Sequence, residues 1–428
     1  MVKIFAKTIV SASMCFIVAL ALFTGAPSKA IGADTIKIGD LNPWSGPFAS
    51  HGRTWTVGIK FAMEEQNSKG GLLGKKIELI PEDNELKPDV ATRRSKKLIL
   101  EDKVDFISSG TGSHIAIAMT KVASGYKKIY INYGGMADFI QGKEFTPYAF
   151  RVFMGTYNVN SAFAMMMASK PYRRYYFINQ DYAAGRDFAR GFKEQLKIYL
   201  PQAEIVGEDF APLGTKDFAP YITKVMAAKA DVIFTGNYLS DLTLLIKQGR
   251  SLGLKQPFPF VCVFAAQDAN TSYEIKDDIV GIYTVQPYSL WVDTPENKQM
   301  IAKYHELHKG DKDFNTWWPD SLIGSTILCW KMVFAAVEKA GSLDPDKFIK
   351  AFEGFTYKTP VGLWTMRACD HQLMMPMFGG RMVAGENPFF NGSIRPDVKF
   401  PWLGKDIETF PASKVTIPAT PDYNPLCR

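Results

Sequence analysis

Glycines and hydroxyl-bearing residues follow two of the β-rich runs of the sequence. In residues 108–116, SSGTGSHIA, Thr111 and Ser113 are flanked by glycines and open a helix-like stretch. Free backbone N–H groups and hydroxyls at the N-terminus of a helix suit a carboxylate. An ordinary helix cap at Ser113 is the alternative, and the two interpretations are compatible. Residues 132–138, NYGGMAD, contain paired glycines that allow the backbone to approach a ligand.

No constellation in the sequence indicates catalysis. The G-x-S-x-G elbow, the G-x-x-x-x-G-K-[ST] loop, the H-E-x-x-H zinc helix and the G-x-G-x-x-G dinucleotide motif are all missing. His51 and His114 follow different β-rich runs and pair with no obvious serine or cysteine nucleophile. His305 and His308 share a helix face, but the charged residues around them favour a solvated surface over a metal site. We therefore expect a binding protein with no enzymatic activity, no cofactor and no metal.

The first thirty residues have the composition of a secretory signal peptide. Two lysines precede an apolar run at residues 9–23, and small residues follow up to Ala30. A membrane anchor is the alternative, but the run is shorter than the ~20 residues of a spanning helix. Cys15 lies inside the apolar run, so lipid attachment is not expected. We expect cleavage near Ala30 or Ala33 and a periplasmic mature protein.

The mature chain carries only a mild positive charge. Removing residues 1–30 takes away three lysines and no acid, so the formal net charge falls from +7 to +4. That charge is too small to indicate a nucleic-acid partner. The roughly 400 remaining residues suit two lobes, at about 100 to 200 residues per domain.

Four cysteines remain after cleavage, and none belongs to a C-x-x-C motif. Cys262 and Cys329 lie in the apolar runs PFVCVF and LIGSTILCWKMVFAAV, where a free buried cysteine is expected. Cys369 and Cys427 lie in polar, loop-like surroundings near the C-terminus. An oxidising compartment permits disulfides, so we favour a Cys369–Cys427 bridge, although sequence does not determine connectivity.

Short β-rich runs alternate with longer amphipathic stretches after the leader. TIKIGDL, KKIELIPE, VDFISS and KIYIN are separated by helical patterns, and the alternation starts again at RRYYFIN, residues 173–179. It continues through AEIVGEDF, DVIFTG and PFVCVF. This alternation predicts right-handed βαβ units and parallel sheets. We therefore expect an α/β protein with two similar lobes in succession.

Three short extended segments are the candidate boundaries between the lobes, and three crossings indicate a hinge. These segments are residues 148–153, 283–288 and 359–364. Lobe 1 is expected to comprise residues 31–152 plus 286–360, and lobe 2 residues 153–285 plus 361–428. The last sixty residues are rich in proline, glycine and aromatic residues, which predicts an extended, wrapping tail.

Five segments of the sequence carry a recognisable pattern. They are IKIGDLNPWSGPFASHG, GIKFAMEEQNSKGGLLGKKIELIPEDNELKPDVA, NQDYAAGRDFARGF, GTKDFAPYITKVMAAKADVIFTG and LIKQGRSLGL. Together they resemble periplasmic binding proteins of the leucine/isoleucine/valine type, which serve ABC importers. The resemblance extends from about Asp34 to Trp364. It implies the type I periplasmic binding protein fold: two Rossmann-like lobes joined by three hinge crossovers, with a ligand in the cleft between them.

The resemblance also implies which residues of lobe 1 contact the ligand. In this family, hydroxyls and backbone amides of the first-lobe loops hold the ligand's carboxylate. The matching residues here are Gly112 and Ser113 after the third strand, beside Thr111, and Gly135, Met136 and Asp138 after the fourth. The loop at residues 42–52 would form a side wall of the cleft, with His51 at the matching position and Trp44 and Phe48 nearby.

The second lobe departs from the amino-acid-binding pattern. Ala184 stands where amino-acid binders of this family place a tyrosine, and Phe264 stands where they carry the acid that holds the ligand's ammonium. An ammonium buried without a counter-charge costs several kcal/mol, so an α-amino acid is not the expected ligand. A shift of the alignment by a few residues would let Asp268 supply the acid instead.

Aromatic residues are expected around the cleft, although each could equally belong to the core, since 13% of the chain is aromatic. They are Trp44, Phe48, Tyr133, Tyr182, Tyr238, Phe264, Trp317 and Trp318. Apolar walls with a few polar groups are typical of a pocket for a small apolar or aromatic carboxylate. We expect a solute-binding protein that delivers such a ligand to an ABC permease in the inner membrane. An amino-acid binder, an amide or urea binder, a ligand-sensing protein of the same fold and a periplasmic enzyme remain the alternatives.

Overall fold

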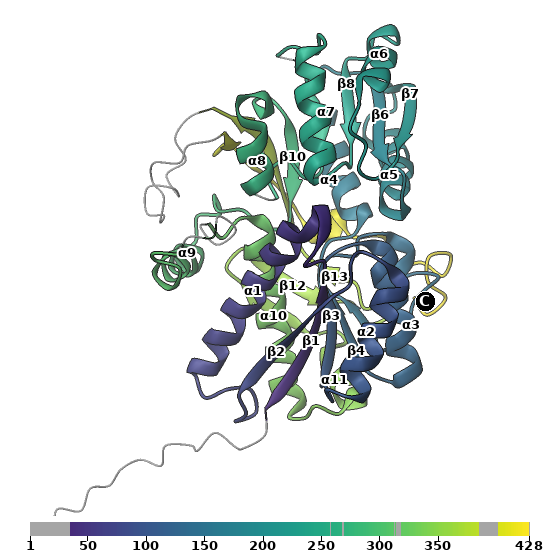
Figure 1. Cartoon of the computed structure of the whole chain (residues 1–428). Helices are drawn as coiled ribbons and strands as arrows, with labels where there is room; N and C mark the ends of the chain where they lie inside the picture. Colours follow the sequence, from purple (N-terminus) through teal and green to yellow (C-terminus); the bar gives the residue numbers. More distant parts are fainter. Residues whose placement is uncertain are drawn as a thin grey trace, which may run out of the picture.

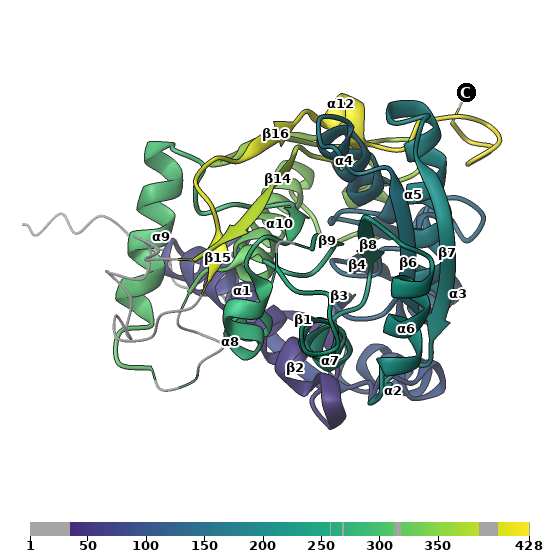
Figure 2. The same cartoon turned by 90° about the horizontal axis from the view of Figure 1, so that it is seen from above.

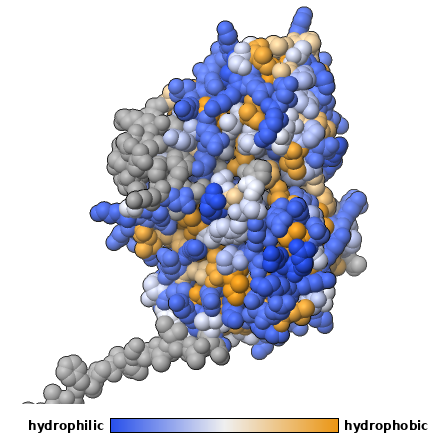
Figure 3. All heavy atoms as spheres, in the orientation of Figure 1, coloured by the Kyte–Doolittle hydropathy of each residue, from blue (hydrophilic) through white to orange (hydrophobic). Residues whose placement is uncertain are grey.

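The computed structural model describes residues 35–256, 258–267, 269–311, 313, 318–384 and 401–427. The signal peptide expected at residues 1–30 lies outside the described residues, as do Asp268 and Trp317. The described residues form two α/β lobes, one above the other in Figure 1. On the face drawn in Figure 3, hydrophilic residues cover most of both lobes and apolar residues are scattered among them.

Lobe 1, the lower lobe in Figure 1, is built on a parallel five-stranded sheet with the order β2-β1-β3-β4-β5. Its strands are β1 (Ile36–Asn42), β2 (Ile77–Asp83), β3 (Phe106–Ser109), β4 (Ile129–Asn132) and β5 (Ala149–Arg151). Its connecting helices are η1 (Gly46–Phe48), α1 (Ala49–Ser68), α2 (Pro88–Leu100), α3 (Ser113–Tyr126) and η2 (Asp138–Ile140). The central strands β3 and β4 are buried at every position, as expected for a sheet covered on both faces.

Lobe 2 is built on an eight-stranded sheet with the order β15-β14-β10-β9-β8-β6-β7, in which β16 also pairs with β14. Its parallel strands are β6 (Arg174–Gln180), β7 (Glu204–Ala211), β8 (Val232–Thr235), β9 (Phe260–Cys262) and β10 (Tyr283–Gln286). The antiparallel additions are β14 (Met377–Val383), β15 (Trp402–Leu403) and β16 (Glu408–Phe410). The helices are α4 (Thr156–Ala168), α5 (Ala183–Tyr199), α6 (Ala219–Ala227), α7 (Leu239–Ser251), α8 (Ala269–Ile275) and η3 (Lys276–Ile279).

The chain returns to lobe 1 after β10. This part contains α9 (Pro295–Leu307), α10 (Ser321–Ala340), α11 (Pro345–Phe352) and a small antiparallel sheet of β11 (Thr356–Thr359), β12 (Gly362–Met366) and β13 (Leu373–Met374). Among the described residues, α10 is the one helix long and apolar enough to cross a membrane, but most of it is buried in the protein. It packs closely along α1, since a Cβ at Gly58 would lie 2.7 Å from Cβ of Thr326. It is therefore a core helix.

Three crossings connect the lobes before the tail. The first two, between β5 and α4 and between β10 and α9, lie at or next to the predicted segments 148–153 and 283–288. The third lies between β13 and β14, whereas the predicted segment 359–364 belongs to the β11–β12 hairpin. The tail then crosses back, because α12 (Ala412–Val415) packs against α4 of lobe 2 (Figure 2), whereas the hydroxyl of Tyr423 donates to the carbonyl of Asp138 in lobe 1 at 2.8 Å. The lobe boundaries stay a prediction, and these contacts argue for counting β12, β13 and the end of the tail with lobe 1.

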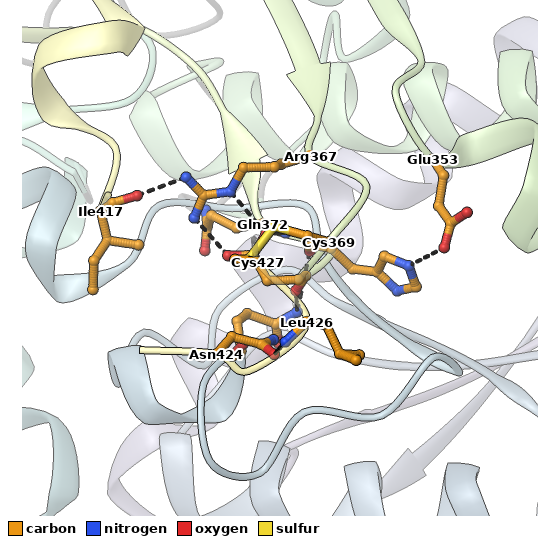
Figure 4. Close-up of a disulfide and its surroundings, with 11 residues drawn as sticks. Glu353, Arg367, Cys369, Gln372, Ile417, Asn424, Leu426 and Cys427 are labelled. Carbon is orange, nitrogen blue, oxygen red and sulfur yellow. Dashed lines mark hydrogen bonds and ion pairs between the residues drawn. A yellow bond between two sulfur atoms is a disulfide. The ribbon is translucent and has the colours of Figure 1, made fainter. Parts of the chain in front are cut away.

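The predicted disulfide between Cys369 and Cys427 is present and fixes the end of the tail to lobe 1. Arg367 lies beside it and donates a 2.6 Å hydrogen bond to the carbonyl of Ile417 (Figure 4). Cys262 and Cys329 are free and buried, as expected.

Candidate ligand-binding site

A cavity of about 30 Å³ lies between the lobes, where loops follow the carboxyl ends of the strands. Lobe 1 contributes the first turns of α1 and the loops after β3 and β4. Its lining residues are His51, Trp55, Gly110, Thr111, Gly112, Ser113, Gly134 and Met136. The segment after β5 and the loops of lobe 2 contribute Phe153, Tyr182, Ala184, Tyr238, Phe264 and Gln267.

The start of α3 presents hydrogen-bond donors to this cavity. The first intrahelical bond runs from the N–H of Ala116 to the carbonyl of Gly112, so the amides of residues 113–115 precede the helical ladder. Ser113 Oγ accepts hydrogen bonds from the N–H groups of Met136 at 3.2 Å and Ala137 at 3.1 Å, so its own hydrogen remains to be donated. Thr111 Oγ1 is buried without a partner among the described residues. These donors and the positive end of the helix dipole suit an anion.

A buried polar network fixes the loop after β3 that carries these donors, here called the donor loop. Asn42 Oδ1 accepts a hydrogen bond from the N–H of Gly110 at 3.0 Å, and Asn42 Nδ2 donates to Asp40 at 2.8 Å. Asp40 also accepts from the hydroxyls of Tyr133 at 2.5 Å and Ser108 at 2.8 Å. Burial raises the pKa of Asp40 to about 6. The network fixes the position of the loop relative to β1.

Two glycines allow the loops after β3 and β4 to touch. A Cβ at Gly134 would lie 1.6 Å from the carbonyl oxygen of Gly110. A Cβ at Gly110 would lie 2.3 Å from the ring of Tyr133 and 2.7 Å from the ring of Trp55. Any side chain at either position would therefore move one loop away from the cavity.

Aromatic rings from both lobes meet around the cavity. The ring of Tyr238 in lobe 2 lies 5.9 Å from the ring of His51 and stacks on the ring of Phe48 at 5.2 Å, measured between centroids. Tyr238 also lies 5.5 Å from Phe264 and 6.1 Å from Tyr182. These rings form an apolar wall that both lobes build together.

The described lining residues include no carboxylate, lysine or arginine, so this part of the lining carries no fixed charge. Its titratable groups are His51, Tyr182 and Tyr238. Burial lowers the pKa of His51 to about 4, so this imidazole is neutral at neutral pH. Burial raises the pKa of Tyr182 and Tyr238 and keeps both phenols neutral. Asp268 follows Gln267 in the chain and lies outside the described residues.

The structure brings eight of the thirteen predicted contact residues together around the cavity. They are His51, Thr111, Gly112, Ser113, Met136, Tyr182, Tyr238 and Phe264. Phe48 lies one layer behind, against Tyr238. Their contact with a ligand stays a prediction.

The other four predicted residues lie elsewhere. The backbone N–H of Trp44 donates to Asp83 at the end of β2, and the N–H of Gly135 donates to the side chain of Asn132 at 2.7 Å. Trp318 is buried just before α10. Asp138 contacts the other lobe, as described next. Tyr133, expected near the cleft, belongs to the network below the donor loop.

Asp138 joins the lobes beside the hinge. Its N–H donates to Asp187 Oδ2 at 2.7 Å, and the hydroxyl of Thr156 lies 2.7 Å from Asp138 Oδ2 and 3.2 Å from Asp187 Oδ2. Arg151 lies 3.5 Å from Asp138, and Arg190 lies 2.7 Å from Asp187. Burial raises the pKa of Asp138 to about 6, since the lowering effect of the Arg151 charge only partly offsets it and the charge of Asp187 adds to the rise.

Sequence reasoning missed several lining residues, above all Trp55 and Gln267. It assigned residues 42–52 to a loop, whereas α1 begins at Ala49, so His51 lies on the helix and Trp55 follows it four residues later on the same face. That spacing was the available signal. Gln267 is a single carboxamide at the end of the apolar run VCVFAA, which was also visible.

Comparisons with known proteins agree with this arrangement. A family model described as periplasmic binding protein matches residues 35–387. Leu/Ile/Val-binding protein homolog 4 of Brucella abortus (strain 2308) is 26% identical over 380 residues, which cover 84% of this chain and 87% of the relative.

Two solved structures have a similar fold. The leucine-, isoleucine-, valine-, threonine- and alanine-binding protein of Brucella ovis, in its closed conformation, has a TM-score of 0.78 and 24% identity, over 90% of this chain and 97% of that one. A solute-binding protein of an ABC transporter from Rhodopseudomonas palustris BisB5, in complex with 3,4-dihydroxybenzoic acid, has a TM-score of 0.74 and 23% identity, over 88% and 98%. The chain therefore belongs to the periplasmic binding protein family.

Proposed function

We propose that this protein captures a small apolar or aromatic carboxylate that carries no amine, and delivers it to the permease of an ABC importer. The observation that carries the proposal is the composition of the cavity. Donors at the start of α3 face a space whose described lining is otherwise aromatic, aliphatic or neutral polar. The family implies a periplasmic location and a small-molecule ligand, in agreement with the leader expected at residues 1–30.

The carboxylate would accept hydrogen bonds from Ser113, Thr111 and the first amides of α3. No cation is required, because several neutral donors and the helix dipole can hold an anion together. The rest of the ligand would lie among Trp55, Tyr182, Tyr238 and Phe264, which favour a flat or branched apolar body.

The absence of an acid from the described lining argues against an α-amino acid. A buried ammonium without a counter-charge costs several kcal/mol. The solved structures include proteins for both classes of ligand, since one is named for the binding of five amino acids and another holds 3,4-dihydroxybenzoic acid. A carboxylate is common to both kinds of ligand.

Capture of the ligand would involve closure of the two lobes about the hinge. The ligand would bind to lobe 1 in the open form, and closure would bring Tyr182, Tyr238, Phe264 and Gln267 of lobe 2 onto it. The closed form would then dock on the permease. The ligand is not altered in this cycle.

An amino-acid binder is the second candidate, because Asp268 follows a lining residue in the chain and the relatives include Leu/Ile/Val-binding proteins. A ligand-sensing protein that presents its ligand to a receptor would use the same cavity.

Mass spectrometry of small molecules released from the purified, unrefolded protein tests the proposed ligand class. We expect a carboxylate without an amine. Release of an amino acid, amide or urea would contradict the proposal.

A further inference from the structure

Gln267 of lobe 2 lines the cavity and carries a buried hydrogen-bond acceptor, Oε1. It follows β9 and is completely buried. Its Nε2 donates to the carbonyl of Val263 at 3.1 Å. This bond fixes the orientation of the carboxamide, and Oε1 is the group that is left to accept a hydrogen bond. In the part of the chain that the structure describes, Oε1 has no hydrogen-bond partner, although the residue lines the cavity. A buried acceptor of this kind is unfavourable unless a group donates to it.

Trp55 of lobe 1 lines the same cavity and carries a hydrogen-bond donor, Nε1. Its Nε1 is buried and also has no partner among the described residues. A hydroxyl group both donates and accepts, so one hydroxyl matches the chemistry of Gln267 Oε1 and Trp55 Nε1 together. An ammonium only donates, and it would find no counter-charge in the described lining.

We infer that Gln267 is a specificity-determining residue, which selects carboxylates that also carry a hydroxyl group. The inference rests on the proposed function, because it takes the carboxylate to be held by Ser113 and Thr111 of lobe 1. Gln267 of lobe 2 then contacts the hydroxyl group of the ligand. A hydroxylated ligand therefore gains its second polar contact only when the lobes close.

Gln286 provides a matched control. It is buried on β10, and its Oε1 likewise has no partner among the described residues, but it does not line the cavity. If buried glutamine acceptors mattered only for folding, Q267L and Q286L would behave alike. A role in ligand selection predicts that only Q267L changes which ligand is preferred.

Isothermal titration calorimetry tests the inference with benzoate, 3-hydroxybenzoate and 4-hydroxybenzoate, and with 4-methylpentanoate and its 2-hydroxy derivative. We expect the native protein to bind at least one hydroxylated acid about 10- to 100-fold more tightly than its parent acid. The Q267L variant should lose that preference because the hydroxylated acid binds more weakly, while binding of the parent acid changes by less than about threefold. The Q286L variant should keep the preference.

Two results would overturn the inference, and they are distinguishable. Equal binding of every hydroxylated acid and its parent by the native protein would remove the role of Gln267 while leaving the proposed function intact. Failure of all five acids to bind would overturn the proposed function and the inference with it. The comparison on the native protein decides the matter even where a Gln267 variant does not fold.

Discussion

The N–H of Asp138 in lobe 1 donates a 2.7 Å hydrogen bond to Asp187 Oδ2 in lobe 2. The resemblance placed Asp138 among the residues that hold the ligand's carboxylate, but the structure places it in a buried contact between the lobes. Thr156 bridges the two carboxylates, and Arg151 and Arg190 flank them. Opening of the hinge would separate this pair and return Asp138 to water.

This relationship predicts that ligand affinity depends on pH. Burial raises the pKa of Asp138 to about 6 in this arrangement of the lobes, so protonation of Asp138 favours this arrangement over one in which opening of the hinge exposes it. Affinity for an amine-free acid should therefore rise as the pH falls from 7.5 to 5, by at most about tenfold per pH unit. Calorimetry across this range measures the effect, and D138N should flatten the profile. An affinity that falls on acidification in the native protein would contradict the assignment.

Ser113 should contribute directly to carboxylate binding. Its hydroxyl hydrogen is available because its oxygen already accepts from Met136 and Ala137. A hydrogen bond to a charged group contributes about 1.5–3 kcal/mol, so S113A should weaken binding roughly 10- to 150-fold. S161A is the control, because Ser161 is a buried serine of α4 that does not line the cavity. Equal effects of the two substitutions on affinity would argue against the assigned role.

Gly134 should tolerate no side chain. In G134A the new Cβ would lie 1.6 Å from the carbonyl oxygen of Gly110, so the two loops must separate. We expect a lower melting temperature and a loss of ligand binding. G125A on α3 is the matched control, since nothing lies within 4 Å of a Cβ there and alanine favours a helix over glycine by up to about 1 kcal/mol. Thermal unfolding with and without ligand compares the two, and normal binding by G134A would refute the close approach.

The disulfide should stabilise the tail on lobe 1. Cys369 and Cys427 are separated by 58 residues. Removal of a native disulfide typically lowers the free energy of unfolding of a secreted domain by about 2–5 kcal/mol. The double variant C369S/C427S should unfold at a lower temperature than the native protein. Alkylation of the denatured, unreduced protein should label Cys262 and Cys329 and spare the other two. Labelling of all four would show that the bridge is not formed.

The sequence predicted the parts of the fold that local pattern determines. The β-rich runs became β1, β2, β3, β4 and β6 to β9, and the polar surroundings of Cys369 and Cys427 indicated their pairing. The return of the tail to lobe 1 was not predictable, because it depends on long-range contacts such as that of Tyr423 with Asp138.

Part of the candidate site was predictable because local pattern also determines where the strands end. Thr111 and Ser113 lie directly after a β-rich run, so topology alone places them at the cleft. Asp138 was placed at the ligand because the sequence does not reveal that Asp187 of another lobe lies against it. Trp55 was missed because residues 49–52 were assigned to the preceding loop, whereas α1 already begins at Ala49.

The most direct measurement of the central claim is calorimetry with acids that differ from amino acids only by the amine. The pairs are 3-phenylpropionate with phenylalanine, and 4-methylpentanoate with leucine. The account predicts that one amine-free acid binds at least 30-fold more tightly than its partner, because an unpaired buried charge costs at least about 2 kcal/mol. Equal or tighter binding of leucine or phenylalanine, abolished by D268N, would contradict the account and assign the ammonium to Asp268.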